Sequence, residues 1–137
     1  MDRAEALIRL ARARAGHLGT VRPDGRPHVV VVTFAAVAGN LVTAIDHKPK
    51  RTERLQRLEN IEANRWASLL IDHYEEDWDR LWWVRMDGPA SIHQGDELWS
   101  EAIASLVGKY AQYEKQPPRG PVIVIAQDRL TWWDGTR

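Results

Sequence analysis

The chain has 137 residues, of which 44% are hydrophobic and 28% charged, and 19 basic side chains balance 19 acidic ones. This composition is typical of one globular domain, which we expect over residues 1–137. Zero net charge argues against a nucleic-acid or membrane-surface binder, and the lack of cysteine excludes disulfides and thiolate metal sites. No apolar run approaches the ~20 residues of a membrane span. A cytoplasmic enzyme or binding protein fits these observations.

The first predicted element is an amphipathic helix over residues 2–15, which Gly16 ends. The side chains expected on its apolar face are Ala4, Leu7, Ile8, Ala11 and Ala15.

Three strands follow, over residues 17–21, 28–36 and 41–45. An Asp-Gly turn joins the first two, and the second contains four consecutive valines. Short turns between the strands predict an antiparallel meander. Because the second strand is apolar without alternation, we expect both of its faces to be covered, the outer one by a helix, a ligand or a second subunit.

A basic loop, residues 46–52 (DHKPKRT), leads from the third strand into a helix expected over 53–62, with Thr52 as its N-cap. Unpartnered N–H groups of a first helical turn and the helix dipole favour an anion there. Lys48, Lys50 and Arg51 add positive side chains at the same point. The loop is therefore a candidate phosphate site, and a solvated basic turn is the alternative.

The second half of the chain predicts strands over 66–72, 80–92 and 121–126 and a helix over 97–110. In each of the pairs Trp82-Trp83 and Trp132-Trp133, one ring should face the core, because adjacent strand residues point to opposite sides. Six strands with few long loops predict a mainly β (α+β) fold, a small closed or split antiparallel barrel with helices outside.

An acidic, aromatic loop over residues 72–79 holds the side chains considered for a substrate. His73 and Tyr74 could line a substrate pocket, with Tyr74 as a proton donor, or could merely cap a strand end. Trp78 is the better candidate for substrate contact among the tryptophans. No histidine pair has metal-ligand spacing, so we expect no metal site.

Three segments resemble the split-barrel flavin and deazaflavin enzymes related to pyridoxamine 5'-phosphate oxidase. They are residues 19–28 (GTVRPDGRPH), residues 48–52 (KPKRT), and residues 69–72 (LLID) with 87–90 (DGPA). Residues 46–50 (DHKPK) and 72–74 (DHY), with Trp78, Trp82 and Trp83, are similar to a branch that uses coenzyme F420.

The resemblance implies a six-stranded antiparallel split barrel of the FMN-binding type, forming a homodimer with cofactor sites between subunits. The cofactor ring would lie on Val31, Val32 and Thr33. Its phosphate would meet Lys50, Arg51 and Thr52, with Lys48 next. The strand that carries basic side chains in many flavin-binding relatives is apolar here, which favours the deazaflavin.

The function expected from this resemblance is an F420-dependent oxidoreductase that passes hydride between the deazaflavin and a small unsaturated or heteroaromatic molecule. A site of this kind needs no dedicated catalytic acid, because the cofactor performs the difficult step. Two alternatives stay open. One is an FMN-dependent enzyme like pyridoxamine-phosphate oxidase, and the other is a non-catalytic F420 or haem-type binding protein on the same fold.

Overall fold

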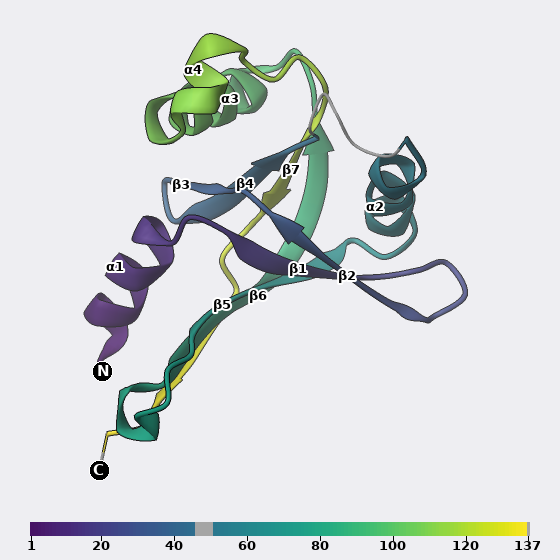
Figure 1. The fold of residues 1–137 in the computed structure, drawn as a ribbon. Coiled ribbons are helices and arrows are strands. Elements are labelled where there is room, and N and C mark those ends of the chain that lie inside the picture. Colours follow the sequence, from purple (N-terminus) through teal and green to yellow (C-terminus); the bar gives the residue numbers. More distant parts are fainter. Residues whose placement is uncertain (46–50, 137) are drawn as a thin grey trace.

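The computed structural model describes residues 1–45 and 51–136, and for residues 51–55 we consider the backbone alone. Figure 1 shows the arrangement of the elements. In chain order they are α1 (Arg3–Arg12), β1 (Gly16–Val21), β2 (Pro27–Val32), β3 (Ala35–Val37), β4 (Asn40–Ala44), α2 (Arg51–Ala63), β5 (Trp66–His73), the 3-10 turn η1 (Trp78–Arg80), β6 (Trp82–His93), α3 (Glu97–Lys109), α4 (Ala111–Lys115), β7 (Val122–Ile125) and β8 (Arg129–Asp134).

The strands form one antiparallel sheet in the order β2-β1-β5-β6-β7-β4-β3, and β8 also pairs with β6. The long strand β6 belongs to both halves of this sheet. Its residues 82–89 pair with β5, and residues 90–93 pair with β7. The sheet is not closed, and helices flank it. The predicted mainly β split-barrel fold is therefore confirmed, with eight strands in the described residues where six were expected.

One of the two additional strands arises because the predicted strand 28–36 is divided. β2 pairs with β1, whereas β3 pairs with β4, and Thr33 and Phe34 lie between them. The predicted strand 28–36 therefore does pair antiparallel with both neighbours of the expected meander, but through separate halves, and β4 pairs with β7 on its other side. The consecutive residues Phe34 and Ala35 enter two different core clusters, so the chain passes here from one half of the sheet to the other. The other additional strand is β8, which follows the last strand expected from the sequence, 121–126.

Two core clusters account for the apolar runs in β4 and β7. Leu41 and Ile125 belong to the first cluster, and Val42 and Val124 belong to the second, beneath α3. Adjacent strand residues point to opposite faces, so these strands are buried on both sides. In Figure 1, α3 and α4 lie over the end of the molecule that β3, β4 and β7 form.

The apolar face of α1 differs from the prediction. The helix buries Ala6 and Leu10, with Ala13 packed against the same cluster, while Ile8 is 46% exposed. The predicted and the observed buried residues both recur at helical spacing, because alanine and leucine occur on several faces of this helix. Packing against the sheet determines which of these faces is buried. Gly16 begins β1, and α1 ends at Arg12.

The prediction for α3 is confirmed almost to the residue. The Asp96 Oδ1 atom accepts a hydrogen bond from the Trp99 amide at 2.8 Å, which caps the helix start. Leu106 and Tyr110 are buried, and Trp99 and Ile103 pack against the second cluster, so one face of the helix is apolar and covered. The backbone turns extended at Tyr110, and α4 begins at the next residue.

Paired ends of β5, β6 and β8 extend away from the body as an arm, which we call the projection (residues 72–83 and 132–136) (Figure 1). The tryptophans there follow the predicted alternation. Trp82 and Trp132 pack against the core, and Trp133 is 47% exposed. In the described part of the chain, no helix has the length and apolarity needed to span a membrane.

Candidate functional site

A slot of about 240 Å³ opens between β2, β4, α2 and α4. The described residues that line it are Ala15, Val31, Val32, Thr33, Thr43, Ala44, Arg57 and Tyr113. Pockets that enclose a whole drug-sized ligand have about 300–1,000 Å³. The slot in one chain is therefore sized to hold part of such a ligand, with the rest outside.

One wall of the slot is the end of β2, where the family resemblance implies the contacts with the cofactor ring. Val32 is buried, whereas Val31 is 70% exposed and Val29, two residues earlier on the same face, is 66% exposed. Thr33 follows, and its carbonyl accepts a hydrogen bond from the Thr43 hydroxyl at 2.7 Å. The structure thus brings Val31, Val32 and Thr33 together at one opening, with an apolar surface suited to a flat ring.

Helix α2 supplies the charged wall. Its orientation is fixed by a chain of polar contacts, in which the Gln56 amide donates to Asn60 at 2.7 Å and the Asn60 amide donates to the Thr20 hydroxyl at 3.0 Å. Asn60 is fully buried, and Arg57 on the same helix is 8% exposed. A guanidinium held in a partly desolvated slot interacts more strongly with an anion than one in water does.

Two lining residues were not identified as site residues from the sequence. Tyr113 lies in α4, where its hydroxyl is 2.9 Å from the Thr33 hydroxyl. The sequence feature that could have identified Arg57 is its position about one turn beyond the basic loop. No sequence feature pointed to Tyr113, because its role depends on a contact with a residue 80 positions away.

The predicted phosphate-binding residues can be placed in part. Lys48 and Lys50 lie outside the described residues. Arg51 is the first residue of α2, so the helix does begin directly after the basic loop. Thr52 lies within the first turn and not before it, and the prediction that it is the N-cap is wrong. The helix begins two residues earlier than expected, and arginine, a good helix former, occupies its first position.

The predicted substrate residues lie on the projection and not in the slot. His73 stacks on Trp82 with ring centroids 6.1 Å apart, and its Nε2 atom is 3.1 Å from a Glu75 carboxylate oxygen. The Tyr74 hydroxyl donates to Glu76 at 3.3 Å. Trp78 is 67% exposed in η1. None of these three residues is among the slot-lining residues that the structure describes.

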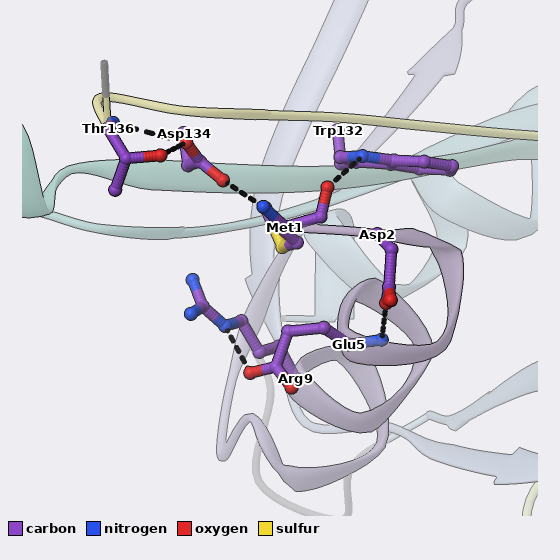
Figure 2. Close-up of polar contacts among 7 residues, drawn as sticks. All are labelled: Met1, Asp2, Glu5, Arg9, Trp132, Asp134 and Thr136. Carbon is purple, nitrogen blue, oxygen red and sulfur yellow. Dashed lines mark hydrogen bonds and ion pairs between the residues drawn. The ribbon is translucent and has the colours of Figure 1, made fainter.

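A second cavity of about 350 Å³ lies at the base of the projection, where His73 and Trp82 meet Met1, Arg9 and Asp134. Figure 2 shows how the chain ends are tied together there: the Met1 ammonium donates to Asp134 at 2.6 Å, and the Trp132 indole donates to the Met1 carbonyl at 3.1 Å. These bonds to the ammonium and to Thr136 lower the pKa of Asp134 to about 2. Many polar groups of this cavity form hydrogen bonds with each other. We therefore interpret it as a structural contact between the two ends of the chain and not as a ligand site.

Within the described residues, no group of three or more histidine, aspartate or glutamate side chains is arranged to hold a metal ion. The slot contains apolar, hydroxyl and guanidinium groups. This donor set suits a flat organic ligand with an anionic part.

An open antiparallel sheet with flanking helices and a slot at a strand break defines a protein of the split-barrel class. The chain matches the model of the family described as pyridoxamine 5'-phosphate oxidase over residues 2–135. The chain belongs to this family. A search of the curated proteins finds no match.

Similar solved structures agree on the fold. A conserved hypothetical protein from Mycobacterium tuberculosis is 22% identical with a TM-score of 0.80, covering 98% of this chain and 86% of its own. A heme binding protein from Mycobacterium smegmatis is 24% identical with a TM-score of 0.76, covering 96% of this chain and 53% of its own. An FAD binding protein from the same organism is 14% identical with a TM-score of 0.66, covering 97% and 96%.

Proposed function

We propose that the protein is an F420-dependent oxidoreductase that transfers hydride between the deazaflavin and a small unsaturated or heteroaromatic substrate. The observation that supports this most is the slot itself. Val31, Val32 and Thr33 form its apolar wall, and Arg57 faces them from the helix that follows the basic loop. An apolar wall opposite a cation suits a planar ring joined to an anionic tail.

Each wall has its own task in this proposal. The backbone and side chains of Val31 and Val32 support the ring, and Thr33 and Tyr113 offer hydroxyl groups at its edge. Arg57 and the start of α2, with Arg51, Thr52, Lys50 and Lys48, hold the phosphate-bearing tail. The bound cofactor supplies hydride chemistry, and the protein positions the substrate and excludes water.

The uncovered face of β2 supports a homodimer with cofactor sites between the subunits, which we propose to act in the cytoplasm. Val29 and Val31 are both more than 60% exposed in the single chain. A second subunit would cover these side chains and complete the slot. His73, Tyr74 and Trp78 are held on the projection of the same chain, so we propose that they reach the substrate at the slot of the other subunit, where Tyr74 would be a weak candidate for a proton donor.

Titration with coenzyme F420, followed by its fluorescence, tests the proposal. We expect binding at micromolar concentrations, and replacement of both Lys50 and Arg51 by alanine should weaken it by one to two orders of magnitude, about 1.4–2.8 kcal/mol. The matched control replaces two basic residues outside the site, Arg3 and Lys115, and should bind like the wild type. Equal affinities of the two double variants would show that the loop takes no part.

Two other ligands should be tested, because proteins of similar structure bind a flavin or haem. The FAD binding proteins among them support the flavin alternative, an FMN-dependent enzyme. Purified protein that is yellow, with flavin absorbance, would favour it, and colourless protein would argue against it.

Haem is the second alternative, because heme binding and storage proteins share the fold. Haem iron is held by histidine, cysteine, methionine or tyrosine side chains. Of the described slot-lining residues, Tyr113 belongs to this set. A Soret band that appears on haem addition and is lost in Tyr113→Phe would support a non-catalytic haem binder.

A further inference from the structure

Side chains from the end of α3 and from α4 contact the chain segments that line the slot. Ala15 and Thr33 both line it, and each lies next to a residue of the paired positions Gly16 and Val32 of β1 and β2. Tyr110 contacts the chain neighbours of both. Its hydroxyl lies 2.9 Å from the Arg14 carbonyl and 3.0 Å from the Phe34 carbonyl, and it accepts a hydrogen bond from the Phe34 amide at 3.1 Å. One phenol thus joins the segment before β1 to the break between β2 and β3.

Two neighbouring side chains act on the same break. The Lys109 Nζ atom donates to the Phe34 carbonyl at 2.8 Å and lies 4.2 Å from the centre of the Phe34 ring. The Tyr113 hydroxyl is 2.9 Å from the Thr33 hydroxyl. Lys109 and Tyr110 can both face the break because α3 ends between them and the backbone is extended at Tyr110.

The Arg14 side chain completes the arrangement. It donates to the Lys109 carbonyl at 3.1 Å, and its guanidinium lies 4.6 Å from the centre of the Tyr110 ring. The segment before Ala15 is therefore held to the end of α3 by both its backbone and its side chain.

We propose that Lys109, Tyr110 and Tyr113 are positioning residues that hold the break at Thr33 and Phe34, and with it this part of the slot lining, against the end of α3 and α4, and that Lys109 makes the affinity of the slot for an anionic planar ligand depend on pH. The nature of the ligand rests on the proposed function. The clamp formed by these three side chains is a property of the ligand-free chain.

The direction of the pH dependence follows from the surroundings of Lys109. The pKa of Lys109 is lowered to about 8, mainly by burial and to a smaller extent by the positive charge of Arg14. Among the other ionisable side chains on elements that pack against this end of α3, Tyr110 has its ring centre 5.3 Å from the Lys109 Nζ atom, and α4 carries Tyr113, Glu114 and Lys115. The strands β3, β4 and β7, on which α3 packs, carry no ionisable side chain. A bound anion favours the protonated amine, so the ligand should bind more tightly below pH 8 and more weakly above it.

The first experiment measures amide hydrogen exchange by NMR in the ligand-free protein. In Tyr110→Phe the Phe34 amide loses its hydrogen-bond acceptor, and we expect its exchange to accelerate by about tenfold or more, with the β7 amide of Ile123 little changed. Equal acceleration of the two amides would mean general loss of stability and would overturn the positioning role. This result does not depend on F420 binding.

The second experiment titrates coenzyme F420 at pH 7 and pH 9 into the wild type, Lys109→Met, Lys109→Arg and the exposed control Lys115→Met. At each pH, the affinity of each protein is divided by that of Lys109→Met. Any effect of the ligand's own ionisation is the same for both proteins and cancels in this ratio. We expect affinity relative to Lys109→Met to fall by about threefold to tenfold between pH 7 and pH 9 in the wild type and Lys115→Met, and to stay constant in Lys109→Arg. A constant ratio for the wild type would overturn the role of Lys109. Absence of F420 binding in every protein would refute the proposed function, and the exchange experiment would still decide on the clamp.

Discussion

Arg57 is the residue on which the proposed anion site depends most within the described chain. Its side chain is 8% exposed and faces the apolar wall of the slot. We expect Arg57→Gln to weaken F420 binding by about tenfold, or about 1.4 kcal/mol. Arg57→Lys should recover part of the loss, because it keeps the charge but not the planar fork of donors.

The control for this prediction is Arg65→Gln, which removes an exposed arginine just after the same helix. Fluorescence titration and a melting temperature should be measured for each variant. Equal affinities of Arg57→Gln and Arg65→Gln, with both proteins folded, would contradict the role given to Arg57.

Lys109 also leads to a prediction for stability. Its pKa is lowered to about 8 in the folded protein and lies near its ordinary value of 10.5 in the unfolded chain. Between these values the unfolded state binds more protons, so the free energy of unfolding should rise with pH. Urea unfolding at several pH values from 7.5 to about 10.5 should show a steeper rise for the wild type than for Lys109→Met. Parallel curves would show that the amine is not desolvated.

At the scale of elements, strand β6 depends on Gly88 to pass from one half of the sheet to the other. A Cβ atom there would overlap the carbonyl of Ala126. That segment cannot move freely, because the Ala126 amide donates to the Pro89 carbonyl at 2.8 Å. We expect Gly88→Ala to lower the free energy of unfolding by about 3 kcal/mol or more.

Gly108→Ala is the matched control for the same substitution. A Cβ atom at Gly108 would meet open space, and the residue lies within α3. This variant should be as stable as the wild type or more stable by up to about 1 kcal/mol, because alanine is the better helix former. Urea unfolding of both variants decides the matter, and equal stabilities would refute the role of Gly88.

The sequence predicted correctly those helices whose apolar spacing and caps lie within the helix or directly beside it. The helix expected over 97–110 is α3 (Glu97–Lys109), with its Asp96 cap, and the helix expected over 53–62 is α2 (Arg51–Ala63). The division of the predicted strand 28–36 at Thr33 and Phe34 was missed, because it depends on which partner strand each half meets. The sequence shows four valines there but not the two core clusters between which the chain passes.

The candidate site was predictable to a similar extent. Val31, Val32 and Thr33 were expected together and do line one slot. Tyr113 and the clamp from Lys109 and Tyr110 were not expected, because their contacts join residues 75 to 80 positions apart. His73, Tyr74 and Trp78 are neighbours in sequence and on the projection, but their place relative to the slot depends on the assembly.

At the scale of the whole molecule, the uncovered apolar face of β2 predicts association of two chains. Val29 is 66% exposed, and a charge at this position would have to be desolvated in the proposed interface. We expect the wild type to sediment as a dimer and Val29→Glu to sediment as a folded monomer. Ile8→Glu, at an exposed position on α1, should remain dimeric. A monomeric wild type, or a dimeric Val29→Glu, would contradict this assembly.

The central claim is that the slot between β2 and α2 holds the ring of F420 and presents its anionic tail to basic side chains. A crystal structure of the protein with coenzyme F420 tests it most directly. We predict the ring against Val31, Val32 and Thr33, and the phosphate beside Arg57 and the start of α2. A ring bound elsewhere, such as in the cavity beside Trp82 on the projection, would contradict the account.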